Sequence, residues 1–199
     1  PIVYDLGRAL RVVERSSGPE HVNAASIRQN LGSVLQQLGR SDEALAELQR
    51  ALAIRELALG PTHPDVATLR ANIGTLLALQ GKTREAAPVL RQSLADLEAA
   101  LGPEHPDLAD SLLGLCELGL KTADPSAALL AAERALRLRG AGAPNDLAAA
   151  RFAVARALVA SGGDRLRALE LAQAARLALP PTSGELPAID RWLARHRPG

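Results

Sequence analysis

The sequence predicts an all-α solenoid, in which antiparallel helix pairs stack along one axis. The first observation is a repeated segment: Leu59-Gly60-Pro61-Thr62-His63-Pro64-Asp65 returns 42 residues later at 101–107, and a diverged copy lies 42 residues earlier at 17–23. A fixed period of about 20 to 50 residues indicates stacked supersecondary units rather than one closed core. The second observation is composition. Alanine and leucine dominate and aromatic residues make up only 2% of the chain, which favours helix throughout.

The charge of the chain is nearly balanced, with a formal net charge of +1. This balance predicts neither nucleic-acid nor membrane binding, and the sequence has no unbroken run of about 18 apolar residues. Residues 1–124 carry 12 Lys and Arg against 16 Asp and Glu, whereas residues 125–199 carry 11 against 6. An acidic partner would therefore suit the C-terminal part better, although a solvated charged surface explains the same excess.

The single cysteine, Cys116, excludes an internal disulfide and is typical of a reducing compartment, so we expect a cytoplasmic protein. The chain begins at Pro1 and contains no methionine, which predicts a piece of a longer protein. At a shift of 42 positions, residues 1–17 align with the second helix of a repeat. We therefore expect a half repeat there, whose first helix is missing.

Two complete repeats are predicted next, each with a first helix, a glycine-containing turn and a return helix. Ser41 or Asp42 can cap the first return helix. Pro64 stands where proline is tolerated, at a helix start, and Gly60 stands where a helix stops. The repeats span 18–59 and 60–101, with first helices at about 22–38 and 63–80 and return helices at about 42–59 and 84–101.

Two further repeats follow the pattern less closely. In the third, Pro106 opens the first helix, Ala123-Asp124-Pro125 replaces the turn glycine, and the return helix is expected near Pro125. The fourth enters at Pro144-Asn145-Asp146, and a break at 180–184 follows it. We predict these repeats at 102–141 and 142–179, and an amphipathic capping helix at 184–197 that lays Leu186, Ile189, Trp192 and Leu193 on the open end of the stack.

Small residues recur at four fixed places in each repeat, and close helix crossing requires such residues at the contact. They are Gly32, Gly39, Ala44 and Ala51, then Gly74, Gly81, Ala86 and Ser93, then Cys116, Ala123, Ala128 and Ala135, and finally Ala155, Gly162, Ala168 and Ala175.

This spacing resembles the tetratricopeptide repeat. The 42-residue period and the Leu-Gly-Pro-x-His-Pro-Asp connector resemble the longer variety found in kinesin light chains and many bacterial proteins. The resemblance covers nearly the whole chain and implies a right-handed superhelix. The chain departs from the family at two places. Leu35, Leu77 and Leu158 fill a place that is often aromatic, and Gly119 fills it in the third repeat, which predicts a less rigid unit there. Arg28, Arg70 and Arg151 fill a usually apolar place, where we expect their stems to cover the core while the charges stay in water.

A narrower resemblance concerns the parent protein. The richness in arginine and alanine, with only Lys82 and Lys121 as lysines, resembles the C-terminal tails of certain bacterial serine/threonine protein kinases. No Gly-rich loop or kinase catalytic signature lies within the chain, so we do not expect it to transfer a phosphoryl group itself.

The tetratricopeptide resemblance implies that the first helices line a concave groove. Asn30 and Asn72 occupy equivalent places there, and a row of amides can hold the backbone of an extended peptide. The alternative is that both amides are solvated or satisfy a local helix end. Phe152 could anchor a partner side chain or belong to the core. Arg156 could pair with a carboxylate or be simply exposed. The expected groove residues are Ser26, Gln29, Asn30, Ser33 and Gln37, then Thr68, Ala71, Asn72, Thr75 and Leu79, then Asp110, Leu113, Glu117 and Lys121, and finally Phe152 and Arg156.

Other chemistry has weaker support in the sequence. His21, His63 and His105 recur once per repeat, which favours a role in the connectors over metal binding. Cys116 replaces a packing glycine, so we expect it to be buried and inert. Asp110 and Glu117 could mimic a catalytic carboxylate pair, but a polar groove wall is favoured.

The function predicted from these observations is a protein-interaction scaffold that binds a peptide or partner segment in its groove. No enzyme activity, cofactor or metal is expected. The alternative is a self-association module, formed through the exposed first helix or the open ends of the array.

Overall fold

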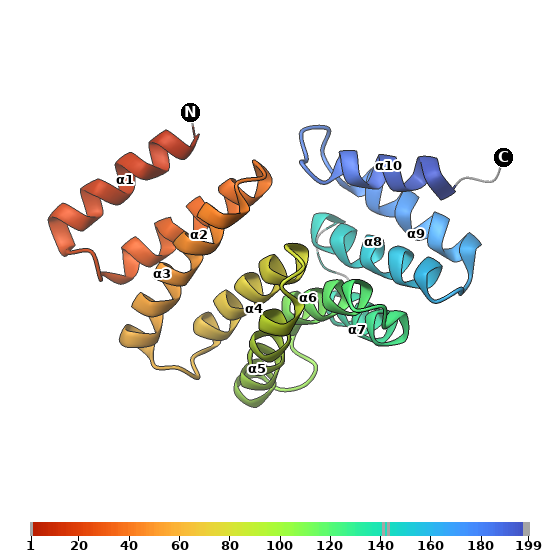
Figure 1. The fold of residues 1–199 in the computed structure, drawn as a ribbon, viewed down its shortest axis with the longest axis horizontal. Helices are drawn as coiled ribbons and strands as arrows, with labels where there is room; N and C mark the ends of the chain where they lie inside the picture. Colours follow the sequence, from red (N-terminus) through yellow and green to blue (C-terminus); the bar gives the residue numbers. More distant parts are fainter. Residues whose placement is uncertain (1, 141, 143, 197–199) are drawn as a thin grey trace. The chain divides into compact units, whose positions relative to one another are not determined.

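The computed structural model describes residues 2–140, 142 and 144–196, and these residues form ten α-helices and no strand (Figure 1). The chain divides into two compact units, the first ending at Pro103 and the second beginning at Glu104. The predicted all-α fold of helix pairs is confirmed, while the bounds of the individual repeats stay predictions. The helices are α1 (Ile2–Ser17), α2 (Val22–Gln37), α3 (Ser41–Leu59), α4 (Pro64–Leu79), α5 (Thr83–Leu101), α6 (Leu108–Lys121), α7 (Pro125–Arg139), α8 (Pro144–Ala160), α9 (Arg165–Ala178) and α10 (Leu186–His196).

Glycine sets the helix crossings of the first unit, in which α2 packs on α3 and α4 packs on α5. A Cβ atom on Gly32 would lie 2.8 Å from Cγ of Leu48, and one on Gly74 would lie 2.6 Å from Cγ of Leu90. Both leucines are fully buried. The small residues predicted at these two places are therefore required by close packing.

A histidine in each connector satisfies a backbone donor near the start of the following helix. Nδ1 of His21 accepts a hydrogen bond from the N–H of residue 23 (3.2 Å). His63 and His105 do the same for the N–H groups of residues 65 (3.1 Å) and 107 (3.2 Å). Such N–H groups have no partner within the helix itself. The predicted connector role of the three histidines is confirmed.

The turns between paired helices need a backbone with positive φ. Gly39 and Gly81 have φ values of 75° and 78°, in the region that favours glycine. In the third repeat Ala123 holds this place with a φ of 56°. Asp124 then accepts a hydrogen bond from the N–H of Ala127 (3.0 Å) and so caps α7, which begins at Pro125 as predicted.

One predicted helix cap and one predicted helix start are wrong. α3 begins at Ser41, so Ser41 and Asp42 lie inside its first turn, and the preceding Arg40 makes no side-chain capping bond. α6 begins at Leu108 rather than at Pro106, because the N–H groups of residues 108 and 109 bond to the carbonyls of residues 105 and 106 in a tight turn.

The second unit has an alanine-rich core that α10 completes. Ile189 and Leu193 of α10 are buried in this core together with alanines of α9. Leu186 and Trp192 are only partly buried. A Cβ atom on Gly119 would lie 2.9 Å from the backbone of α7, so glycine is needed for the close approach of that helix. The start of the fourth repeat at Pro144-Asn145-Asp146 coincides with the start of α8, but the side chains of these three residues lie outside the described ones.

Candidate partner-binding surfaces

An arginine ties three helices together in the first repeat. Arg28 on α2 forms an ion pair with Glu14 on α1 and another, at 2.6 Å, with Glu47 on α3. Only 11% of the arginine side chain is exposed. Opposite charges attract strongly at this separation in a partly buried place. The three helices are therefore joined by charge as well as by apolar packing.

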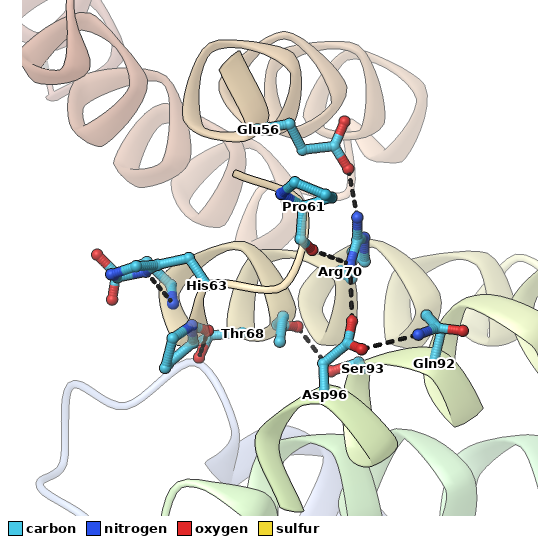
Figure 2. Close-up of polar contacts among 11 residues, drawn as sticks. Glu56, Pro61, His63, Thr68, Arg70, Gln92, Ser93 and Asp96 are labelled. Atoms are coloured by element: carbon cyan, nitrogen blue, oxygen red, sulfur yellow. Dashed lines mark hydrogen bonds and ion pairs between the residues drawn. The ribbon is translucent and has the colours of Figure 1, made fainter. Parts of the chain in front are cut away.

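Arg70 holds the equivalent place on α4 and reaches α3 and α5 (Figure 2). Its Nη2 lies 2.6 Å from Oε1 of Glu56, and its Nη1 lies 2.8 Å from Oδ2 of Asp96 and 2.7 Å from the carbonyl of Pro61. Asp96 also accepts a hydrogen bond from Gln92 (2.7 Å). The expectation that Arg28 and Arg70 keep their charges in water is wrong, because both charges are compensated by carboxylates. The sequence did contain a signal for this pairing, because Glu14 and Glu56 recur one repeat apart, as Arg28 and Arg70 do.

The two arginines take their second carboxylate from different places. Glu47 supplies it in the first repeat, but Val89 stands at that place in the second repeat and Asp96 supplies the carboxylate instead. Val89 then lines an open pocket of about 540 Å³ between α3, α4 and α5, together with Leu52, Ile73, Leu77 and Pro88. The first unit thus carries an open pocket that the sequence analysis did not consider, and its other walls are polar, from Gln49, Arg70, Glu85 and Gln92.

The predicted groove residues of α2 and α4 form a polar, accessible face. Asn30 is exposed and Asn72 is partly exposed, and neither amide has a hydrogen-bond partner among the described residues. One part of the alternative interpretation, that these amides satisfy a helix end, is therefore excluded for residues 2–140, 142 and 144–196. Among the other predicted positions, Ala71 is buried, Gln29, Thr68 and Thr75 are partly buried, and Ser26, Ser33, Gln37 and Leu79 are exposed.

Three of the predicted hydroxyl groups bond within their own helix. Ser26 donates to the carbonyl of Val22 (3.5 Å). Ser33 donates to the carbonyl of Gln29 (3.1 Å), and Thr68 donates to the carbonyl of Pro64 (3.0 Å). Each hydroxyl can still accept a hydrogen bond from a partner.

The predicted acidic residues of α6 are each bound to an arginine. Asp110 pairs with Arg139 of α7, and Glu117 pairs with both terminal nitrogens of Arg156 on α8. Each of the two carboxylates is therefore held in its own ion pair with an arginine of a neighbouring helix. Arg156 is accordingly paired within the chain, whereas Lys121, the remaining predicted position on α6, is exposed.

Phe152 is partly buried and packs against α10 rather than standing alone. Its ring makes an edge-to-face contact with Trp192 (centroids 5.9 Å apart, interplanar angle 88°), and the guanidinium of Arg156 lies over the ring at 5.8 Å. Trp192 also stacks on His196 at 4.3 Å. These residues border an open pocket of about 360 Å³ whose other lining residues are Ala188, Arg191 and Arg195. The sequence analysis assigned Trp192 only to covering the end of the stack.

Cys116 and the possible metal ligands were the remaining candidates for chemistry in the sequence. Burial, together with the nearby charge of Glu117, raises the pKa of Cys116 to about 12. The predicted burial of this cysteine is confirmed, and its thiol stays protonated at neutral pH. Within the described part of the chain, histidine, cysteine and acidic side chains form no group that could hold a metal ion. None of the described helices is long and apolar enough to cross a membrane.

These observations define the class of the protein: a stack of helix hairpins that presents side-chain surfaces. Residues 5–56 and 25–99 match the family model of the tetratricopeptide repeat. Residues 5–99 therefore belong to the tetratricopeptide repeat family, as their spacing of small residues predicts. This fold is typically a non-catalytic scaffold, and tetratricopeptide repeats generally mediate protein–protein interactions.

Three crystal structures show the same fold over most of this chain. BtubC (BKLC) from P. vanneervenii is 20% identical, with a TM-score of 0.66 over 98% of this chain and 74% of that one. The nearly identical TPR-like repeats of a Podosopora anserina protein assigned as a kinesin light chain are 22% identical, with a TM-score of 0.62 over 88% and 84%. A substituted variant of the same Podosopora anserina repeats is 21% identical, with a TM-score of 0.64 over 97% and 87%. No curated protein sequence matches the chain.

Proposed function

We propose that the chain is an interaction scaffold that binds an extended peptide segment along the first-helix face of its repeats. The observation that carries this proposal is the pair of amides of Asn30 and Asn72, which stand at the same place one repeat apart and have no hydrogen-bond partner among the described residues. A carboxamide offers two donors and an acceptor, which suits the backbone of an extended chain. The further members of this surface are Gln29, Ser33, Gln37, Thr68, Thr75, Asp110, Glu117, Lys121, Phe152 and Arg156.

The test uses peptides selected from a random display library on the whole chain. Binding of a selected peptide would be measured by fluorescence anisotropy with Asn30→Ala/Asn72→Ala. We expect its affinity to fall at least about tenfold, since each lost hydrogen bond contributes about 0.5–1.5 kcal/mol. Gln173→Ala, which removes an exposed amide from α9, is the matched control. Unchanged affinity in the double variant, with its helicity preserved, would reject the clamp, by which we mean the two amides of Asn30 and Asn72 holding the peptide backbone.

Self-association is the second candidate, and one observation favours it. Ile2 and Val12 of α1 are 57% and 59% exposed, although their counterparts Ala44 and Ile54 in α3 are buried. An apolar helix face that is buried in one repeat and exposed in another could be covered by a second copy of this chain. Sedimentation velocity at rising concentration tests this candidate, and Val12→Glu is expected to abolish any dimer. A wild-type chain that remains monomeric throughout would reject it.

We also propose that the chain serves as a module of a larger regulatory protein, such as a bacterial serine/threonine kinase. The support is the arginine- and alanine-rich composition with few lysines. Sequencing the parent reading frame tests this proposal. A Gly-rich loop with catalytic-loop and metal-binding aspartates is the expected result, and an unrelated neighbouring domain would contradict it.

A further inference from the structure

The pocket between α8 and α10 combines aromatic walls with arginines, and it lies wholly within the second unit. Trp192 is held between the edge contact with Phe152 on one side and the stacked ring of His196 on the other. His196 is itself fixed by a hydrogen bond between its Nδ1 and the carbonyl of Trp192 (2.8 Å). The apolar wall is therefore already ordered, so a ligand would not have to immobilise it on binding.

Of the three arginines of this pocket, only Arg156 is paired with a carboxylate among the described residues. Glu117 neutralises Arg156 through two contacts. Arg191 uses only its Nε, which donates to the carbonyl of Pro187 (3.1 Å), and its two terminal nitrogens make no bond to a described residue. Arg195 is exposed and has no partner in the described ranges. Two positive charges are therefore left without a counter-ion among residues 2–140, 142 and 144–196.

The nearest carboxylate on the same helix does not supply that counter-ion. Asp190 precedes Arg191 directly, but it is bound to Arg176 of α9. Arg191 and Arg195 are separated by one helical turn, so their side chains lie on the same side of α10. The pocket consequently presents an excess of two positive charges beside an aromatic wall.

We propose that this pocket binds a phosphorylated serine or threonine side chain of a protein segment, with an apolar neighbour of that residue resting on Phe152 and Trp192. A phosphate monoester carries a charge of about −1.5 to −2 at neutral pH and three acceptor oxygens, which matches two free guanidinium groups. A single carboxylate would neutralise only half of this excess. The inference rests on the proposed function as a peptide-binding scaffold and assigns one subsite of it.

The probe is a fluorescein-labelled peptide pool with a fixed central phosphoserine and random flanking residues. Matched pools carry serine or a Glu-Glu pair at the centre, and binding to the whole chain is measured by anisotropy. We expect the phosphoserine pool to bind at least about tenfold more tightly than either matched pool. Serine brings no charge, and a Glu-Glu pair divides its two charges between two side chains, whereas one phosphate presents its charge and three acceptor oxygens at a single centre. Inorganic phosphate at millimolar concentration should compete.

The variant R191Q/R195Q should remove this preference for phosphate. R84Q/R91Q, which removes two exposed arginines from α5, is the charge-matched control and should keep it. Circular dichroism confirms that each variant is folded. The inference is overturned if the phosphoserine pool binds no more tightly than the serine or Glu-Glu pool, or if R191Q/R195Q retains the full preference.

The proposed function is tested separately in the same assay. Serine-pool binding that depends on Asn30 and Asn72 but gains nothing from phosphate would keep the scaffold and reject this subsite. Phosphoserine binding that depends on Arg191 and Arg195 but not on the asparagines would keep the subsite and reject the clamp. Binding by none of the pools would reject both.

Discussion

Replacing Arg70 by methionine removes the cation that joins α3, α4 and α5 while keeping most of the apolar stem. Asp96, with 9% of its side chain exposed, would then keep only Gln92 as a partner. Breaking a buried ion pair by removing one partner costs about 3–5 kcal/mol. The Glu56 contact adds about 0–1 kcal/mol, because that carboxylate is 37% exposed. Since Arg70 is itself 16% exposed and water can reach the remaining carboxylate, we expect a loss of about 3 kcal/mol.

The assay for this prediction is urea and thermal unfolding followed by circular dichroism, with the affected helices located by hydrogen exchange. A loss of about 3 kcal/mol corresponds to a fall of about 6–12 °C in the unfolding midpoint for a chain of this size. The double variant Arg70→Met/Asp96→Ile should recover most of the loss, because isoleucine stands at the equivalent place in the first repeat and the abandoned charge is gone. Arg40→Met, which breaks an exposed pair with Glu43, should leave the unfolding curve nearly unchanged.

One result would refute this reasoning. If Arg70→Met unfolds at the wild-type urea concentration and leaves exchange in α3 to α5 unchanged, the carboxylates do not depend on the arginine. If Arg70→Met loses stability as expected but Arg70→Met/Asp96→Ile does not regain it, the loss comes from packing of the arginine stem rather than from an unpaired Asp96.

Three further substitutions or measurements test other features of the fold. Ala123→Gly should raise the free energy of unfolding by about 1 kcal/mol, because φ is 56° there, and an unchanged melting curve would contradict this. Gly74→Ala should lower the free energy of unfolding by about 1–3 kcal/mol, since the new Cβ would lie 2.6 Å from Cγ of Leu90. Gly184→Ala is the control and should be near neutral, because no atom lies within 4 Å of a Cβ built there. With its pKa raised to about 12, Cys116 has only about one thiolate in ten thousand at pH 8, so a thiol reagent should label the native chain slowly, and faster as pH rises. Rapid labelling of the native chain at pH 8 would contradict this burial.

The helices and their turns could be predicted from the sequence because their causes are local and repeated. Gly39, Gly81 and the connector histidines recur at one spacing, and each satisfies a need of its own turn or helix end. The cap of α3 was misplaced because Ser41 and Asp42 are good capping residues, and nothing local distinguishes the cap position from the first turn beside it.

The surroundings of the candidate surfaces could be predicted only in part. The exposure of Asn30 follows from its place on a first helix, but the pairing of Glu117 with Arg156 joins residues 39 positions apart and depends on how α6 and α8 pack. The role of Trp192 was missed for the same reason. Its neighbour Phe152 lies on α8, and the pocket that they share exists only once α10 has folded back onto the second unit.

The two arginine ties restrict how the repeats of this chain could be recombined. Glu47 in α3 is equivalent to Val89 in α5, and Ile54 in α3 is equivalent to Asp96 in α5. A hybrid return helix that contained both Val89 and Ile54 would offer the arginine of its repeat no second carboxylate. The reciprocal hybrid, with Glu47 and Asp96 together, would place two acids around one cation. A crossover between these places therefore yields two unbalanced products, although both have the native length and apolar pattern. Crossovers outside this stretch of α3 and α5 leave each arginine with one second carboxylate, so the two positions have to be exchanged together.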